Sequence, residues 1–314
     1  MNKVNKEIAS VGVVGLGFMG SAISASIVKE GFHLTGFDIA AERMALLIEK
    51  GGEALSSARE VAEKADMMLT SLPSLAAFED VIWGAKGILS SRRKGLIVME
   101  CSTLSGDDKR KAYDALRKSG ITLLDCPISG GIRAAEKDLV VYGSGEKEAY
   151  ERCLPVIRSF ARANYYLGEF GNGMKMKALA NLLVAIHIVS SAEAMVLGMK
   201  AGLDPELIHK VMNDSSGRSR MLEVRGPRMV KNDYDNPSMK VKIFQKDLKI
   251  IERFASDLNC PTPLFADCMQ IYLGAMAMGF EDKDTACACA VLEEWAQLKR
   301  NKRTRRKQSK GGRE

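Results

Sequence analysis

The sequence lacks the cysteine spacing of a metal site and the even cysteine count of a disulfide framework. Its 314 residues include seven cysteines, and no pair has zinc-ligand spacing with a second pair or with histidines to match. Cys287 and Cys289 stand two apart in an expected helix, so their side chains would point to different faces. We therefore expect buried free thiols, a reducing compartment and no bound metal.

The sequence also lacks a segment of the kind that directs a protein to a membrane. The first ten residues mix Lys, Asn and Glu and contain no apolar core of a secretory signal. The stretch 174–199 is apolar enough to raise the question of a membrane span, but two lysines, a histidine and a glutamate interrupt it. Because charges inside a bilayer are costly, we expect a cytoplasmic protein that binds no membrane.

Excess charge of one sign is absent from most of the chain. The formal net charge is +7, but nine of the 46 basic and one of the 39 acidic residues lie in 299–314. The rest of the chain therefore carries 37 basic and 38 acidic side chains. Residues 299–314 include no large apolar side chain, which predicts a solvated, disordered basic tail. Contact of this tail with nucleic acid is the less favoured alternative.

The first half of the sequence contains short runs rich in Val and Ile that alternate with amphipathic stretches. This alternation predicts an α/β fold, with a mostly parallel, doubly wound sheet covered by helices on both faces. We expect strands at 11–14, 34–37, 67–72, 96–99, 121–124, 139–142 and 165–167, and helices at 19–30, 42–50, 105–118 and 147–160.

The second half, from Gly173 to Arg300, shows no clear strand. A long helix is expected over 174–201, and because it is apolar on nearly all sides it is expected to be buried all round. Asp204 and Pro205 supply an N-cap and a proline at the start of the next helix. Further helices are expected at 221–230, 241–257, 263–278 and 285–299, so the second domain is all-α.

The strongest motif follows the strand at 11–14 and opens a helix. Its first glycine allows a tight turn, its second allows a pyrophosphate to approach the backbone, and its third allows the helix to pack closely on the strand. The phosphates would meet free N–H groups at the helix N-terminus. The motif is Gly15-Leu16-Gly17-Phe18-Met19-Gly20.

Asp38 ends the second expected strand, eighteen positions after Gly20. Its carboxylate suits the ribose hydroxyls of NAD and would repel the 2′-phosphate of NADP. The first basic residue that follows is Arg43, so the sequence offers no obvious clamp for that phosphate. NAD is therefore predicted over NADP, and an N-cap role for Asp38 is the alternative.

The second motif, DCPISGG at 125–131, follows the expected strand 121–124. Successive small residues expose backbone N–H groups in a concave anion site, and Ser129 adds a hydroxyl donor. A substrate carboxylate would suit such a site, although the segment could also be a simple turn.

The third motif places Lys177 and Asn181 four apart, on one face of the long helix, shortly after Gly171-Asn172-Gly173. Desolvation lowers the pKa of a lysine, which suits a general acid/base near neutral pH. A lysine that reaches solvent at the start of a helix is the alternative. Lys246-Asp247, the fourth motif, is by itself typical of a surface ion pair.

In this order and spacing the four motifs resemble the β-hydroxyacid dehydrogenase family, over roughly residues 9–297. The family includes 3-hydroxyisobutyrate dehydrogenase, tartronate semialdehyde reductase, L-threonate dehydrogenase and, more distantly, 6-phosphogluconate dehydrogenase. The resemblance implies an NAD-binding Rossmann-type domain at 1–170 and an all-helical substrate and oligomerisation domain at 171–298. The long helix would join them and lie between the subunits of a homodimer or homotetramer.

The resemblance also implies roles for individual residues. Lys177 would be the catalytic acid/base in hydride transfer between NAD and a small 3-hydroxy acid, such as 3-hydroxyisobutyrate, threonate or glycerate. Asn181 and Lys246 would contact the substrate. The substrate carboxylate would be bound by Ser129, Gly130 and Gly131, and the cofactor by Gly15, Gly17, Phe18, Met19, Gly20, Asp38, Leu72, Pro73, Thr103 and Lys246.

Two departures from the family pattern bear on the substrate. Ala180 stands where the family commonly has Asn, and the segment 185–202 looks closest to the L-threonate dehydrogenase-like branch. His187, ten residues after Lys177, is interpreted as a buried or interface residue. Alternatives remain: an NADPH-dependent semialdehyde or glyoxylate reductase, an imine reductase, and a non-catalytic NAD-binding protein whose tail binds nucleic acid. Asp38 argues against the first, and Lys177 against the other two.

Overall fold

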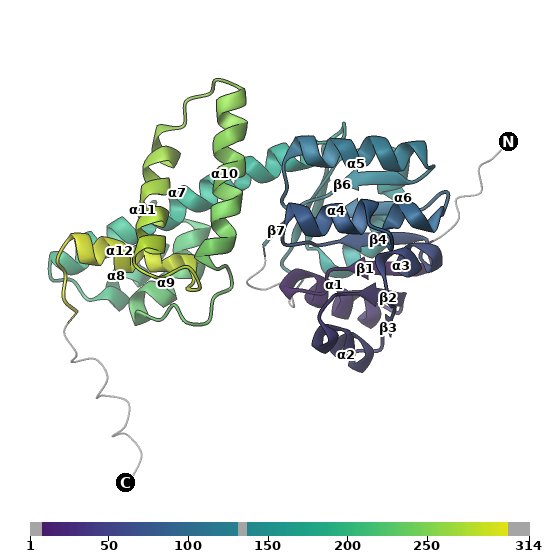
Figure 1. Cartoon of the computed structure of the whole chain (residues 1–314). Helices are drawn as coiled ribbons and strands as arrows, with labels where there is room; N and C mark the ends of the chain where they lie inside the picture. Colours follow the sequence, from purple (N-terminus) through teal and green to yellow (C-terminus); the bar gives the residue numbers. More distant parts are fainter. Residues whose placement is uncertain (1–7, 131–136, 301–314) are drawn as a thin grey trace, which may run out of the picture. The chain divides into compact units, whose positions relative to one another are not determined.

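The computed structural model describes residues 8–130 and 137–300 (Figure 1). The chain divides into two compact units, Met1–Asn181 with Lys249–Phe254, and Leu182–Leu248 with Ala255–Glu314. The division runs through the long helix, whereas the domain boundary expected from the sequence lies at the start of that helix, at 170–171. Gly131 and residues 301–314 of the expected tail lie outside the described residues.

The first unit is built on a six-stranded, all-parallel sheet with the order β3-β2-β1-β4-β5-β6. The order reverses between β1 and β4, and ligands of such sheets bind outside the carboxyl ends of the strands at this point. The expected Rossmann-type fold is therefore confirmed. The strands are β1 (Ser10–Val14), β2 (His33–Phe37), β3 (Glu53–Ala54), β4 (Met67–Thr70), β5 (Ile97–Glu100) and β6 (Thr122–Asp125).

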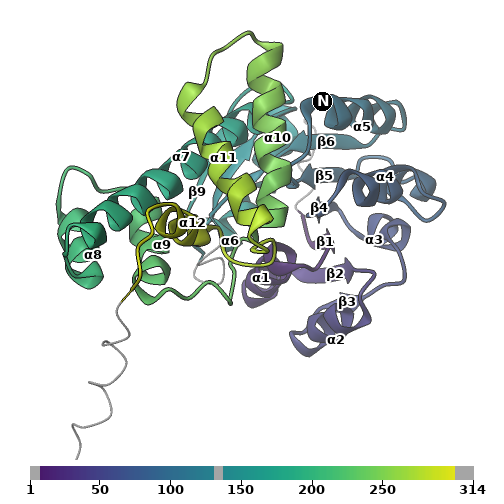
Figure 2. The same cartoon turned by 60° about the vertical axis from the view of Figure 1, so that its left-hand side comes forward.

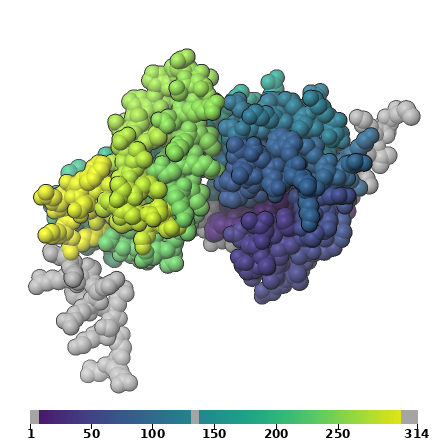
Figure 3. Space-filling model, viewed as in Figure 1, coloured from purple at the N-terminus to yellow at the C-terminus, as the bar shows by residue number. Residues whose placement is uncertain are grey.

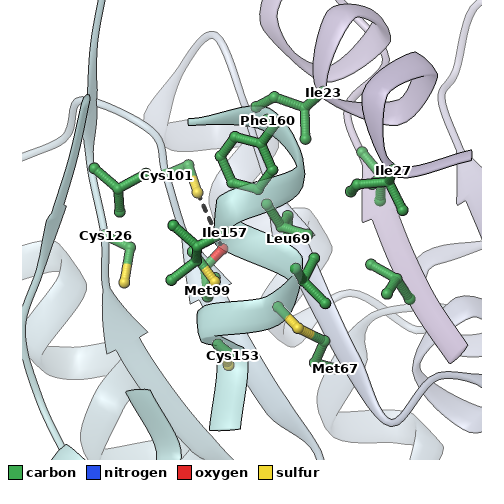
Figure 4. Packing of buried hydrophobic residues seen from close by; sticks show 14 of the residues in the cluster. Ile23, Ile27, Met67, Leu69, Met99, Cys101, Cys126, Cys153, Ile157 and Phe160 are labelled. Carbon is green, nitrogen blue, oxygen red and sulfur yellow. Dashed lines mark hydrogen bonds between the residues drawn. The ribbon is translucent and has the colours of Figure 1, made fainter. Parts of the chain in front are cut away.

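Helices cover both faces of the sheet and bury two separate cores. On one face, Ile23 and Ile27 of α1 pack with Ile157 and Phe160 of α6 over the strands (Figure 4). The core on the other face includes residues of α3, α4 and α5. The helices are α1 (Phe18–Lys29), α2 (Ala41–Glu49), α3 (Ala58–Lys64), α4 (Leu75–Trp83), α5 (Gly106–Lys118) and α6 (Lys147–Phe160), with the 3₁₀ turn η1 (Ile88–Ser91).

A second, three-stranded sheet contains the other strands described in this unit. It has the order β7-β8-β9, with β7 (Ile128–Ser129) antiparallel and β9 (Ala163–Tyr166) parallel to β8 (Val140–Gly143). An isolated bridge between Asp125 and Ser144 links the end of β6 to the end of β8. The segment 125–130 therefore runs from the edge of the large sheet into the small one.

Helices make up the second unit, which begins within α7 (Asn172–Lys200). Figure 2 shows α8 at the end of α7, and α10 and α11 cover much of the face of this unit drawn in Figure 3. Tyr272 anchors α11, since its hydroxyl donates to the Ala185 carbonyl at 3.2 Å and its ring stands edge-on to Phe244. The further elements are α8 (Pro205–Asp214), α9 (Arg220–Lys231), α10 (Val241–Asp257), α11 (Pro263–Ala277), η3 (Thr285–Cys287) and α12 (Ala288–Trp295).

The expectation that the long helix is buried on all sides is wrong for this chain. Buried residues such as Ile188 and Met195 line one side of α7, but Leu179, Leu183 and Leu197 are exposed, Leu197 by 74%. An exposed apolar face on a long helix marks an interaction surface. The composition of the helix could not show which of its apolar residues are buried within the chain and which form such a face.

Arg300 packs against the second unit, although the expected tail begins at residue 299. Its Nη1 donates to the carbonyl of Val230 at 2.8 Å, its Nη2 to that of Met229 at 2.7 Å, and its Nε to Glu293 at 2.9 Å. These two carbonyls belong to the last turn of α9, where few intrahelical donors remain, and that of Met229 also accepts the backbone N–H of Asn232 at 3.4 Å. Arg300 therefore caps α9 instead of belonging to the solvated tail.

All seven cysteines are free, as expected, and Cys260 is the exposed one. For that residue the expectation of burial is wrong, since it lies between α10 and α11. Burial raises the pKa of the other thiols, for example to about 12 for Cys153 and to about 11 for Cys268. Within the described ranges no three His, Cys, Asp or Glu side chains form a metal-binding group.

Candidate active site

The glycine-rich loop joins β1 to α1 at the carboxyl edge of the sheet. Gly15 has a φ of +89°, and a Cβ there would lie 2.2 Å from the carbonyl oxygen of Ser71. A Cβ at Gly20 would lie 1.9 Å from the carbonyl oxygen of Gly15, so both positions require glycine. At Gly17 the nearest atom is 3.8 Å away, which leaves the backbone open to a ligand. The loop therefore fits a pyrophosphate in the way the motif predicts.

Asp38 follows β2 and is tied to the same loop. Its Oδ2 accepts the backbone N–H of Leu16 at 2.7 Å, and its Oδ1 accepts that of Ala40 at 2.9 Å. Ala40, not Asp38, is the N-cap residue of α2. The carboxylate thus lies beside the glycine loop, where the ribose of a dinucleotide is expected.

Arg43 lies against Asp38, which the sequence did not reveal. Its Nη1 is 3.2 Å from Asp38 Oδ2, and its side chain is 46% exposed whereas that of Asp38 is 4% exposed. It is also the nearest side chain to a Cβ built at Gly17. The inference that no base stands near the expected ribose site is therefore wrong. The first turn of α2 brings the arginine back over the end of β2.

The loops after β4 and β5 hold the residues expected at the nicotinamide. The backbone N–H of Leu72 donates to the hydroxyl of Ser102 at 2.8 Å, so the two loops are bonded to each other. The backbone N–H of Ser102 donates in turn to Glu100 at 2.7 Å. Leu72 and Thr103 are half-buried and Pro73 is exposed. All of them lie at the carboxyl ends of neighbouring strands, next to the point where the strand order reverses.

The expected carboxylate site starts in β7. Ser129 is half-buried at the end of this strand, and Gly130, which follows, is exposed with a φ of +102°. A Cβ at Gly130 would lie 2.6 Å from the carbonyl oxygen of Asp138. The turn therefore depends on glycine, and Gly131 lies outside the described residues.

Lys177 reaches this same strand from α7. Its Nζ donates to the carbonyl oxygen of Ile128 at 2.8 Å, and Ile128 is the neighbour of Ser129. Asn181 follows one turn later and is buried. The structure therefore brings Lys177 together with the Ser129-Gly130 turn, although 48 positions separate Lys177 from Ser129 in the sequence.

The glycines before Lys177 fix the start of its helix. Gly171 has a φ of +99°, and a Cβ at Gly173 would lie 2.5 Å from the carbonyl oxygen of Tyr142 and 2.6 Å from that of Asp125. The first turn of α7 can therefore approach the ends of β6 and β8 only because Gly173 has no side chain.

Lys246 belongs to α10 in the second unit. Its Nζ is 3.4 Å from Asp247 Oδ1, so the two residues form the expected ion pair. Asp247 is buried, however, so the expectation of a surface pair is wrong. The expected place of Lys246 near the nicotinamide and substrate stays a prediction.

Sequence reasoning missed Arg43 and the buried Lys109. The five-residue separation of Arg43 from Asp38, at the start of a helix, was a usable signal, since it corresponds to little more than one turn. Lys109 gave little signal, because it stands among charged residues in the first half of the helix sequence GDDKRKAYDALRK, although it shares the buried face with Ala112 and Leu116.

Comparisons with known proteins agree with this arrangement. A family model described as the NAD binding domain of 6-phosphogluconate dehydrogenase matches residues 10–168, and one described as the NAD-binding of NADP-dependent 3-hydroxyisobutyrate dehydrogenase matches residues 171–292. The chain is 31% identical over 289 residues to 2-(hydroxymethyl)glutarate dehydrogenase of Eubacterium barkeri, covering 92% of this chain and 95% of that protein.

The chain is also 32% identical over 285 residues to L-threonate dehydrogenase of Cupriavidus necator, covering 90% and 96% of the two chains. A solved structure of 3-hydroxyisobutyrate dehydrogenase from Salmonella typhimurium matches with a TM-score of 0.83 and 31% identity, over 90% of this chain and 99% of that one. The chain therefore belongs to the β-hydroxyacid dehydrogenase family.

Proposed function

We propose that the protein transfers a hydride between NAD and a small 3-hydroxy acid, with Lys177 as the general acid/base. Family membership supports the coarser statement, that it is an NAD(P)-dependent oxidoreductase acting on the CH–OH group of a hydroxy acid. The observation that carries the finer proposal is the 2.8 Å hydrogen bond from Lys177 Nζ to the Ile128 carbonyl. This bond holds the ammonium beside the turn at Ser129 and Gly130.

The glycine loop and Asp38 would hold the dinucleotide. Gly17 offers open backbone for the pyrophosphate, and Asp38 offers a carboxylate for the ribose hydroxyls. When bound, NAD supplies the acceptor for the hydride of the substrate's carbinol carbon. The contribution of the protein is to orient the substrate and to move one proton.

The substrate class follows from the two groups that would meet it. The Ser129 hydroxyl and the Gly130 backbone N–H would donate to a carboxylate. Lys177 in its neutral form would take the proton of a hydroxyl on a carbon near that carboxylate, and in the reverse reaction its ammonium would protonate the carbonyl oxygen. Small acids such as 3-hydroxyisobutyrate, threonate and glycerate carry both groups at suitable separation.

A second candidate is an NADPH-dependent semialdehyde or glyoxylate reductase. Arg43 favours it, because its guanidinium is half-exposed beside the expected ribose site and would attract a 2′-phosphate. Asp38 opposes it through its charge. The two candidates share the site and differ in cofactor and in direction.

A single screen tests the proposal. A panel of 3-hydroxy acids, with 2-hydroxy acids and simple alcohols as controls, is incubated with NAD and separately with NADP, and the absorbance of the reduced nicotinamide is followed. We expect reduction of NAD with at least one small 3-hydroxy acid and not with the matching alcohol that lacks the carboxylate. Activity with the alcohols alone would contradict the proposed carboxylate site.

We also propose that the protein is a cytoplasmic homo-oligomer in which α7 contacts another subunit. In the described part of the chain α7 is the one helix with the length and apolar composition to cross a membrane. Lys177 in its first half and Glu193 in its second half favour a protein partner over lipid. Light scattering after size-exclusion chromatography without detergent tests this, and a monomer would contradict it.

A further inference from the structure

The proposed chemistry leaves a buried cluster of three charged side chains without a role. The side chain of Lys109, in α5, is 1% exposed, and those of its two carboxylate neighbours, Asp125 and Glu100, are 0% exposed. Its Nζ lies 2.8 Å from Asp125 Oδ1 and 3.8 Å from Glu100 Oε1. Burial by itself lowers the pKa of Lys109, but the two carboxylates outweigh it and the pKa is raised. The lysine is therefore an ammonium at neutral pH.

The other oxygen of Asp125 reaches the start of α7. Asp125 Oδ2 accepts the backbone N–H of Met174 at 2.8 Å, and the neighbouring N–H of Gly173 donates to the Ser144 hydroxyl at 2.9 Å. These N–H groups lie in the first turn of a helix, where no intrahelical acceptor is available. A carboxylate there is also favoured by the helix dipole. Asp125 thus anchors the helix that carries Lys177 one turn later.

A second contact from α5 strengthens the same anchor. Arg110, next to Lys109, donates from Nη2 to the carbonyl of Phe170 at 2.7 Å. Its guanidinium also lies over the rings of Tyr113 and Phe170, 5.1 and 5.0 Å from their centroids. Because Phe170 immediately precedes Gly171, α5 fixes the chain on both sides of the glycine turn that starts α7.

Glu100 extends the cluster toward the expected nicotinamide. Its Oε1 accepts the Ser102 N–H, its Oε2 accepts the hydroxyl of Thr70, and the Ser102 hydroxyl accepts the Leu72 N–H. One carboxylate therefore orders the loops after β4 and β5. Without Lys109, Glu100 and Asp125 would both be buried with no cation within the cluster, which is strongly unfavourable.

We propose that Lys109 is a positioning residue, which fixes the first turn of α7, and with it Lys177, relative to the loops of Leu72 and Ser102 by neutralising Asp125 and Glu100. The proposal rests on the proposed role of Lys177 as the acid/base. It assigns to α5 a role in catalysis without contact to substrate or cofactor.

The test compares Lys109→Met with two matched controls. Lys111→Met removes an exposed lysine of the same helix, and Arg225→Met removes the cation of a different buried pair, Arg225 with Asp284 in the second unit. Hydrogen exchange of the peptide that contains Gly173 and Met174 is measured together with kcat, KM, the cofactor Kd and the pH profile of kcat.

For Lys109→Met we expect exchange at Gly173 and Met174 to be about tenfold faster, which corresponds to the loss of about one hydrogen bond. We expect kcat to fall by about 10- to 100-fold, since small displacements of a catalytic group cost rates of this order. The cofactor Kd changes less than kcat, because the glycine loop is not touched. The limb of the pH profile assigned to Lys177 shifts, which a smaller folded fraction alone cannot produce.

The proposal is overturned if Lys109→Met matches Lys111→Met in exchange and kcat, or if it loses kcat like Arg225→Met with no shift in the pH profile.

A second pair of variants serves if Lys109→Met does not fold. Asp125→Asn keeps an oxygen that can accept the Met174 N–H, and Asp125→Ala removes it. We then expect a smaller loss of kcat for Asn than for Ala, and equal losses would overturn the proposal. Normal kcat in Lys177→Ala would refute the acid/base assignment instead, whereas unchanged exchange in the Lys109 or Asp125 variants refutes the anchor.

Discussion

The guanidinium of Arg43 lies on the carboxylate of Asp38, with Nη1 3.2 Å from Oδ2. The two charges have opposite effects on a dinucleotide with a 2′-phosphate. Asp38 would repel the phosphate, and its carboxylate is held in place by the N–H groups of Leu16 and Ala40. Arg43 would attract the phosphate, and its side chain is 46% exposed. Because the fixed group is the anion, we expect NAD to be preferred, but by less than a lone aspartate would give.

Variants at these two positions should move cofactor preference in opposite directions. Asp38→Asn should lower the ratio of kcat/KM for NAD over NADP by about 10- to 100-fold, because it removes a charge close to the phosphate. Arg43→Met should raise the ratio, since it removes the neighbouring cation and keeps an unbranched apolar stem. Steady-state kinetics with both cofactors checks this. Equal or better use of NADP by the unmodified protein would contradict the assignment of Asp38.

Replacing Lys177 should separate chemistry from cofactor binding. Lys177→Ala should bind NADH with nearly unchanged affinity and lose about 10²- to 10⁴-fold in kcat, the usual contribution of a general acid/base. The pH profile of kcat/KM should lose one limb. Lys175→Ala is the matched control, because this lysine is exposed two positions away and its Nζ bonds to Asn172 at 3.0 Å. A Lys177 variant with the kcat of its control would refute the mechanism.

The buried lysine should make stability sensitive to alkali. The folded-state pKa of Lys109 is raised above its ordinary value of 10.5. Its contribution to the free energy of unfolding is therefore complete below that pH and is lost as the pH rises through the folded-state pKa. Lys109→Met should lower the free energy of unfolding by about 3–5 kcal/mol near pH 8, the usual effect of breaking a buried ion pair. Chemical denaturation should show this difference in the free energy of unfolding between the two proteins narrowing above pH 10.5, and a difference that stays constant there would contradict the assignment.

Thiol labelling should single out Cys260. It is exposed, whereas the other six cysteines are buried and burial raises the pKa of their thiols, to about 12 for Cys287 and Cys289. Since the thiolate is the reactive form, a thiol-specific disulfide reagent should label one cysteine per folded chain and seven after denaturation. Cys260→Ser should abolish the fast reaction. Rapid labelling of a second cysteine in the folded chain would refute the assigned burial.

Truncations on either side of Arg300 should differ in stability. Ending the chain after Arg300 should leave kcat and the melting temperature unchanged. Ending it after Gln297 removes the cap of α9 and leaves Glu293 without its arginine. We therefore expect the free energy of unfolding to fall by about 1–3 kcal/mol. Arg300→Ala in the full chain should reproduce most of this loss. Equal melting temperatures for the two truncations would show that the cap does not matter.

Helix starts were predictable where a polar side chain precedes an apolar pattern. Ser105 accepts the N–H of Asp108, and Asp204 accepts those of Glu206 and Leu207, as expected of N-caps. The same signal was present but overlooked before α3, where Ser57 accepts the N–H of Glu60. Ser74 likewise accepts the N–H of Ala77 before α4, so the starts of both short helices were predictable from the sequence.

The buried charges were not predictable from local sequence. Lys109 stands among Asp108, Arg110 and Lys111, a pattern typical of a solvent-exposed face. Its burial depends on Asp125 and Glu100, which belong to the strands β6 and β5. Spacing along one helix was enough to predict that Lys177 and Asn181 lie one turn apart on α7, whereas the pairing of Lys109 with Asp125 and Glu100 joins separate elements.

The continuity of α7 and α10 limits how such a protein can be recombined. Ten residues of α7 belong to the first unit and the other nineteen to the second. Within α10, Lys249–Phe254 belongs to the first unit and the flanking turns to the second. Domains are ordinarily exchanged through exposed linkers, whereas all three crossings here lie inside helices. A chimaera with a related enzyme must therefore join helix to helix in register, and the two units are expected to be inherited as one module.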